Sequence, residues 1–598
     1  MKKIFAAALF AVTLSQAFAI APVKRIVDAN GKVITPKVNI PTVMDASRVA
    51  EQEQLVSKTY GPSGSSDGLG TYGQTCPTKI GAVKTIGAVT LPVLLVEFSD
   101  VKFQDFTSEQ KLSRQLNEEG YSDVDYVNGR TSYAATGSVR DFFLAQSSGL
   151  FQPTFDVVGR VTLPQTVAYY FQDNEKTERR DINMYSFLSD AMNAAYTKGV
   201  DFSKYVISGN ANIAGTTTGI PMISFICAGY NEASVGYGLY EYNGDKTGLD
   251  MPWPHFSRLS NESGTGYGRK YNGTTVMSYF IGSELYTTTT LKRDADGKTI
   301  ATLGDPYLAG PGTFTHEFGH ALGLPDFYTT DYTEGCKTPN YWSMMDHGNY
   351  FNEGYNLIGY AAYERILLGW LKYTTLGKES QQCTLYPFSA IGKEDTPDDA
   401  VFAYIIKNPL SVKEYYVLED RRADGVFYPS KMGNGMLVAR VYFDYNQWEN
   451  NTLNNKPETQ RYSIIPADGK WQEEISGNNY KNDLFPGVSN NYTSLTDDST
   501  PQNAVCLAGT KKVMTRPIYN IRKDGELIRF DYLEDFLTGI STVNAEGIDH
   551  KAYDLQGRQA TVNAAHGIFI VNGKKIIRYP KLLQRLCGHM TAYLTLNF

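Results

Sequence analysis

The stretch at residues 311–350 begins PGTFTHEFGHALGLPDFY and ends, after an intervening loop, NYWSMMDHGNY. Its centre is the pentapeptide HEFGH at residues 316–320, an HExxH pattern. Residues four apart lie on one face of a helix, so both imidazoles can reach one metal ion. Glu317 lies beside them, where a carboxylate can take a proton from a water that the metal activates. This stretch therefore predicts a metal site on a helix.

The predicted helix has an apolar face and a defined end. Phe314, Phe318 and Leu322 recur at four-residue spacing and predict that this face is buried. Gly319 inside a helix costs about 1 kcal/mol relative to Ala, which indicates that another group approaches closely there. Gly323, followed by Leu-Pro, predicts the end of the helix.

The residues after the helix extend the pattern to HExxHxxGxxD. A catalytic zinc usually has three protein ligands and one open position. We expect His316 and His320 to be two of them, and Asp326 to be the third because the turn at Gly323 returns it toward the metal. Glu364, on a predicted downstream helix, is the alternative carboxylate ligand.

The segment SMMD at residues 343–346 predicts a Met-turn beneath the metal. We expect Met345, rather than Met344, to form its apolar floor; the alternative is a methionine that only packs in the core. His347 and Tyr350 are candidates for contacting substrate, but a structural hydrogen bond explains each of them equally well.

The stretches HEFGHALGLPDFY and YWSMMDHGNY closely resemble the immune inhibitor A-like (M6) metallopeptidases, whose motif is related to that of the metzincins. The resemblance extends over about residues 91–529 and includes SVRDFFLAQSSGLF, ICAGYNEA, the WPH at 253–255 and GYAAYERILLGW. It implies a secreted zinc endopeptidase with a metzincin-like fold, in which the site lies beneath an edge strand.

The length and composition of the chain limit the folds and partners that we expect. A chain of 598 residues suggests two to four domains. The 42 Tyr and 54 Gly favour a β-rich α+β protein. A net charge of -7 gives no reason to expect a nucleic-acid partner.

Residues 1–19 have the pattern of a secretory signal peptide: two lysines, a short apolar run and an Ala-Phe-Ala cleavage site. The apolar run is too short for a comfortable membrane span, and no other long apolar segment follows. We therefore expect an extracellular protein, secreted or at the cell surface, without a transmembrane segment.

We interpret residues 20–88 as a propeptide, because the Gly- and Ser-rich run at 61–74 reads as an exposed linker. Cys76 near its end is either a zinc-binding thiol that keeps the enzyme latent or, as isolated thiols more often are, a buried or disulfide-bonded residue. The six cysteines are too widely spaced for a disulfide framework or a zinc finger.

The catalytic domain is expected at residues 89–375. We predict strands at 91–98, 222–227 and 275–280, and helices at 138–146, 181–198 and 359–373. The family resemblance also raises a structural Ca²⁺, but the loop at 207–221 has no acidic residue and does not support one there.

Residues 376–536 change to short β segments separated by turn residues, which favours a β-sandwich-like domain. Residues 537–578 predict a few antiparallel strands. This small β tail resembles the sorting tails of type IX secretion, which implies recognition by secretion machinery. Residues 579–598 stay unassigned.

The sequence thus predicts a zinc metalloendopeptidase that hydrolyses proteins or peptides with a zinc-activated water and with Glu317 as general base and acid. Two other classes stay open. One is a surface binding or adhesion protein with a vestigial peptidase domain. The other is a zinc hydrolase with a non-peptide substrate.

Overall fold

The computed structural model describes the main body of the chain and part of its C-terminal tail. Several sequence-based expectations lie outside the described residues: the signal peptide, nearly all of residues 20–80, Cys76, most of the loop at 207–221 and residues 579–598. The described residues are 68–69, 81–127, 131–173, 181–207, 218–263, 267–287, 289–331, 333–423, 427–471, 479–502, 513–537 and the backbone of 552–553, 559–560, 567–571 and 574–578.

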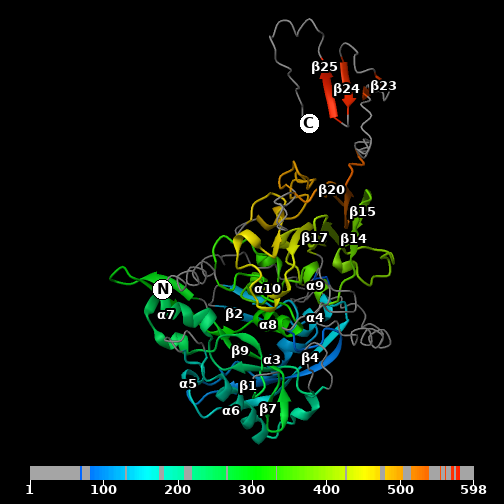
Figure 1. The fold of residues 1–598 in the computed structure, drawn as a ribbon. Helices are drawn as coiled ribbons and strands as arrows, with labels where there is room; N and C mark the ends of the chain where they lie inside the picture. The colour runs from blue at the N-terminus through cyan, green and yellow to red at the C-terminus, as the bar shows by residue number, and fades with distance from the viewer. Residues whose placement is uncertain are drawn as a thin grey trace, which may run out of the picture.

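A five-stranded sheet organises the N-terminal part, with the strand order β4-β1-β5-β9-β6. Figure 1 labels β1, β4 and β9 of this sheet. The first four strands run parallel, and β6 pairs with β9 in the antiparallel direction at the edge. The strands are β1 (Gly87–Glu97), β4 (Phe151–Thr162), β5 (Ile223–Cys227), β6 (His255–Arg258) and β9 (Ser278–Ser283). The family resemblance implied an edge strand above the site, and β6 is an edge strand of this sheet.

Both faces of this sheet are covered because β1 is apolar on both sides. Leu91, Val93 and Leu95 join one buried cluster, and Leu94 and Val96 join another. The first cluster holds side chains of α3 (Glu109–Asn117), α4 (Val139–Gln146) and α8 (Gly312–Leu322). The second holds those of α5 (Val167–Phe171) and α6 (Met184–Thr197). The domain is therefore a three-layer arrangement of helices around a sheet.

The segment just before β1 packs on α8. The backbone amides of Ala82 and Val83 both donate to the carbonyl of Ala321, at 2.8 and 2.9 Å. Trp370 donates its indole N–H to the carbonyl of Thr85 at 2.7 Å. Residues 81–86, which the sequence analysis assigned to the propeptide, thus lie in the core beside α8.

The predicted elements occur with adjusted ends. The strand expected at 275–280 is split: β8 (Thr274–Val276) pairs with β7 (Arg269–Tyr271), and β9 begins at Ser278. The helix expected at 359–373 is only α9 (Ala362–Leu367). Gly369 has a φ of 77°, so the chain leaves the helical path there.

Short elements complete this part of the chain. They are the hairpins β2 (Val124–Val127) with β3 (Thr131–Ala134) and β11 (Thr289–Arg293) with β12 (Thr299–Leu303), the pair β10 (Leu285–Tyr286) with β13 (Tyr307–Leu308), and α7 (Tyr237–Asn243). Among the described residues, no helix is both long and apolar enough to cross a membrane.

The region after α9 contains two further sheets. One has the order β14-β16-β17-β18-β19, and the other has the order β15-β21-β20. The strands are β14 (Thr374–Leu376), β15 (Gln381–Leu385), β16 (Ala403–Asn408), β17 (Ser411–Arg421), β18 (Gly435–Tyr442), β19 (Tyr462–Ile464), β20 (Ile518–Asp524) and β21 (Leu527–Tyr532). Helix α10 (Tyr445–Glu449) follows β18.

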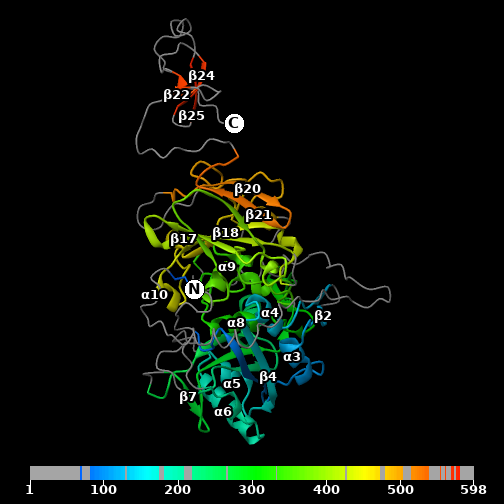
Figure 2. The ribbon, with the colours of Figure 1, turned by 90° about the vertical axis from the view of Figure 1, so that its right-hand side faces the viewer.

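The larger of these sheets is buried on both faces. Tyr416 and Leu418 of β17 share a cluster with Phe530 of β21, whereas Tyr415 and Val417 belong to the same cluster as α8 and β1. Figures 1 and 2 show α8 and α9 between the N-terminal sheet and β17. The C-terminal β region and the region that contains α8 and β1 therefore share one hydrophobic core.

The tail contains a separate four-stranded antiparallel sheet with the order β23-β22-β24-β25. Its strands are β22 (Ala552–Tyr553), β23 (Gln559–Ala560), β24 (Gly567–Val571) and β25 (Lys574–Arg578). The two longest, β24 and β25, lie on either side of the sequence Asn-Gly at 572–573. The overall composition of the chain is thus α+β, as expected.

Candidate metal centre

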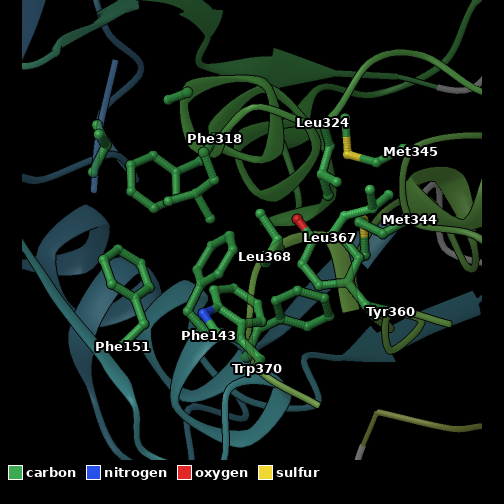
Figure 3. Packing of buried hydrophobic residues seen from close by; sticks show 14 of the residues in the cluster. Phe143, Phe151, Phe318, Leu324, Met344, Met345, Tyr360, Leu367, Leu368 and Trp370 are labelled. Atoms are coloured by element: carbon green, nitrogen blue, oxygen red, sulfur yellow. The ribbon is translucent and has the colours of Figure 1, made fainter. Parts of the chain in front are cut away.

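Helix α8 is held by aromatic packing on the side opposite the histidines. The Phe318 ring lies 4.9 Å from that of Phe143 and 5.1 Å from that of Phe155, both edge to face. Figure 3 shows Phe318 facing Phe143 and Phe151. Gly323 ends the helix in the left-handed conformation, with a φ of 110°. The apolar face and the stop are those that the sequence predicted.

The two histidines are oriented by backbone carbonyls. His316 Nδ1 donates to the carbonyl of Met344 at 2.9 Å, and His320 Nδ1 donates to that of Leu324 at 2.7 Å. A carbonyl can only accept, so the Nδ1 atom carries the proton in each ring. In the neutral tautomer Nε2 then keeps its lone pair, which is the state in which imidazole binds a metal.

Asp326 lies where both of these Nε2 atoms point. Its Oδ1 is 3.0 Å from Nε2 of His316 and 3.2 Å from Nε2 of His320. All three residues are less than 10% exposed. Two nitrogens and one carboxylate oxygen that converge in this way form a donor set that suits zinc.

The alternative ligand, Glu364, is placed elsewhere. Its Oε1 accepts from the Ser343 hydroxyl at 2.6 Å, and its Oε2 accepts from the amide of Ala361 at 2.5 Å. Burial raises the pKa of Glu364 to about 8, partly opposed by these hydrogen bonds. Glu364 thus ties α9 to the segment before Met345.

Glu317 contacts the edge strand of the sheet. Its Oε2 accepts from the backbone amide of Phe256 in β6 at 2.7 Å. Ligand atoms of His316, Glu317 and His320 lie within 4.8 Å of one another. Burial raises the pKa of Glu317, and the two histidines and the Phe256 amide partly offset that effect.

The electrostatics of the cluster favour a charged Asp326. Burial alone would raise the pKa of its carboxyl, but the two histidines outweigh burial and hold that pKa well below its usual range. Burial opposes the imidazolium of His320, yet the Asp326 carboxylate raises the pKa of His320 to about 9. A divalent cation bound here would take the place of the imidazole protons as the positive charge beside Asp326.

Met345 of the SMMD segment packs against α8 at Gly319. A Cβ on Gly319 would overlap Sδ of Met345 and would come within 2.8 Å of the hydroxyl oxygen of Tyr360. The amide of Phe327 donates to the carbonyl of Met345 at 2.9 Å. Figure 3 shows Met344, Met345, Leu324 and Tyr360 in the same apolar region. The close approach predicted at Gly319 is therefore made by Met345 and Tyr360.

The other candidate residues have structural partners. His347 Nδ1 is 2.6 Å from Oδ1 of Asp346, and its ring lies 5.8 Å from that of Tyr341. The side chain of Tyr350 is exposed. A further histidine of this region, His255, donates from Nδ1 to the carbonyl of Trp253 at 2.7 Å, and its Nε2 is 3.0 Å from the Tyr279 hydroxyl.

Three site contacts were not anticipated from the sequence. The amide of Phe256 binds Glu317, and the ring of Tyr328 stacks on that of His316 with centroids 6.3 Å apart. Asn451 binds Asp326 through two hydrogen bonds. Tyr328 lies within the stretch 311–350. Phe256 and Asn451 lie far from that stretch in the sequence, and nothing in their local sequence indicates these contacts.

The fold thus brings His316, Glu317 and His320 together as a group that could hold a metal ion. Residues 78–365 match the sequence model of the immune inhibitor A peptidase family M6, catalytic domain. The predicted resemblance to the M6 peptidases is thereby confirmed for this part of the chain.

Two curated relatives support the same assignment. Immune inhibitor A of Bacillus thuringiensis subsp. alesti is 26% identical over 271 residues, which are 43% of this chain and 36% of the relative. Pre-pro-metalloprotease PrtV of Vibrio cholerae serotype O1 is 25% identical over 275 residues, 43% of this chain and 27% of the relative. The matched part thus spans about a third or less of these relatives' length.

Proposed function

We propose that this protein is a secreted zinc-dependent endopeptidase that hydrolyses peptide bonds in proteins. The observation that carries the proposal is the position of Asp326 Oδ1, within 3.2 Å of the inward-facing nitrogens of both motif histidines. The similarity of residues 78–365 to M6 peptidases favours the same chemistry.

The residues present fit a zinc ion. His316 and His320 offer nitrogen ligands whose tautomers are set by the carbonyls of Met344 and Leu324. Asp326 offers the third ligand, and Met345 is the proposed floor. Bound zinc supplies a Lewis acid that polarises the scissile carbonyl and lowers the pKa of a water.

Glu317 moves the proton in this proposal. Its raised pKa, which results chiefly from burial, suits a carboxylate that accepts a proton from the attacking water and then gives it to the leaving amine. The Phe256 amide holds Oε2, so the carboxylate is oriented while its other oxygen stays available for water. One side chain thus serves as base and then as acid.

The remaining parts of the chain have proposed roles around this centre. We infer a signal peptide at 1–19, a propeptide that begins at residue 20 and ends before the buried segment 81–86, a sandwich-like domain at 376–536 and a tail at 537–578 that secretion machinery recognises. The two sheets that share buried side chains support the sandwich-like domain. No observation on the described residues favours Ca²⁺ as a second cofactor.

Cleavage of an unstructured protein such as casein tests the proposal. The purified, propeptide-trimmed protein should digest casein, and Glu317→Ala should not. Zinc binding with hydrolysis of small esters or amides, but not of casein, would favour the non-peptide hydrolase. Absence of zinc and of any hydrolysis would favour the adhesion protein and would contradict the proposal.

A further inference from the structure

A loop of the C-terminal β region lies against the segment that carries Asp326. This loop, residues 448–455 with the sequence WENNTLNN, begins at the end of α10, continues toward β19 and contains four asparagines. The segment that it contacts is residues 323–330, directly after the metal-site helix. We call the first the asparagine loop and the second the ligand segment.

The asparagine loop binds the ligand segment on both sides of Asp326. Trp448 donates its indole N–H to the carbonyl of Gly323 at 3.3 Å. Asn454 Nδ2 donates to the carbonyl of Phe327 at 2.7 Å, and Asn455 Oδ1 accepts from the amide of Thr330 at 2.9 Å. The backbone before and after Asp326 is therefore fixed by the same loop.

Asn451 contacts Asp326 itself through a reciprocal pair of hydrogen bonds. Asn451 Oδ1 accepts from the backbone amide of Asp326 at 2.7 Å, and Asn451 Nδ2 donates to its Oδ2 at 2.6 Å. One amide side chain thus fixes both the backbone and the carboxylate. Because Oδ2 is occupied, Oδ1 is the oxygen that faces the two histidines.

The asparagine loop is itself rigidly supported. Asn454 is fully buried, and its Oδ1 accepts from the amides of Arg461 and Tyr462. The ring of Phe327 packs 4.7 Å from that of Tyr462. Asn451 has a φ of 55°, a conformation that asparagine and glycine adopt more readily than other residues.

We propose that Asn451 is the positioning residue of the metal centre, orienting Asp326 through its side-chain amide. The C-terminal β region would then act as part of the metal site and not as a separable module. This inference rests on the proposed zinc site. Outer contacts of this kind typically contribute about 10–100-fold to metal affinity.

The test is the zinc affinity of the whole mature protein, measured by competition with a chromophoric chelator. We use Asn451→Gly, because glycine keeps the positive φ and removes only the amide. Its zinc affinity should fall by about 10–100-fold. Asn450→Gly is the matched control, since Asn450 is exposed and precedes Asn451; its affinity should equal that of the unaltered protein.

A double-mutant cycle separates positioning from a general structural role. In an Asp326→Ala background, Asn451→Gly should cause no further loss of zinc affinity, because its effect passes through Asp326. An equal loss in both backgrounds, or unchanged affinity in Asn451→Gly alone, would overturn the inference.

A second variant covers the case in which Asn451→Gly does not fold. Asn451→Asp keeps the size and tolerates the positive φ, but replaces the donor with a carboxylate that repels Asp326. It should also weaken zinc binding, and an affinity equal to that of the unaltered protein would contradict the inference. If the unaltered protein itself bound no zinc, the proposed function would fail instead.

Discussion

Met345 occupies the space that any side chain at Gly319 would need. A Cβ at Gly319 would overlap its Sδ atom, and the Tyr360 hydroxyl oxygen would lie 2.8 Å away. Both neighbours are fully buried. The glycine of the HExxH helix thus permits close packing between the helix and the methionine beneath it.

Gly319→Ala should therefore destabilise the protein, although the same change stabilises an ordinary exposed helix by about 1 kcal/mol. Overpacking a core of this kind costs about 1–3 kcal/mol. Chemical denaturation of the metal-free protein measures the change. The penalty should be smaller in a Met345→Ala background, and an equal penalty there would show that Met345 is not the obstacle.

Glu317→Gln should keep zinc and lose turnover. The glutamine oxygen can still accept from the Phe256 amide, but it cannot take up a proton from water. General acid–base catalysis is typically worth about 10²–10⁴-fold, so casein cleavage should fall by at least that range. Zinc content serves as the control. Full activity in this variant would remove Glu317 from its assigned role.

The two candidate carboxylate ligands predict opposite results. Asp326→Ala removes a group that contacts both histidines, so its zinc affinity should fall by more than the roughly 100-fold typical of outer contacts. Glu364→Gln disturbs hydrogen bonds to Ser343 and Ala361, which should cost about 1–3 kcal/mol of folding stability and leave zinc affinity unchanged. If Glu364→Gln lost zinc affinity and Asp326→Ala kept it, Glu364 would be the ligand.

Asp483 should make folding stability depend on pH. Burial raises its pKa to about 7, although the Trp342 indole N–H donates to Oδ2 at 2.8 Å. The folded state then holds a proton that the unfolded state releases above its ordinary pKa of 3.8, so stability is lost as the pH rises from about 4 to 7.

The matched variant is Asp483→Asn, which stays neutral. Between pH 5 and 8, the unaltered protein should lose about 2–3 kcal/mol more unfolding free energy than this variant. Urea denaturation of the metal-free proteins measures the difference. Parallel pH profiles would show that Asp483 ionises normally in the folded state.

Features that depend on one short stretch of residues could be predicted from the sequence. The spacing of His316 and His320, the apolar stripe of α8 and the stop at Gly323 are local, since each depends on residues within about one or two helical turns. The position of Asp326 followed from the same turn. The nearly continuous apolar run at 91–98 likewise predicted a strand in a sheet that is covered on both faces.

Contacts between segments that are distant in the sequence could not be predicted from it. Asn451 is separated from Asp326 by 125 positions, and asparagine in a polar stretch ordinarily signals a turn. The periodic pattern at 359–373 also predicted a longer helix than α9, because a helical pattern does not reveal that Gly369 takes a positive φ. The place of residues 81–86 beside α8 depends on the carbonyl of Ala321, far along the chain.

The most direct test of the central claim is titration of the metal-free, propeptide-trimmed protein with zinc while casein cleavage is followed. The account predicts one tightly bound zinc per chain, activity that rises to a plateau at one equivalent, and loss of that activity on chelation. Cleavage that persists without metal, or a protein that binds no zinc, would contradict it.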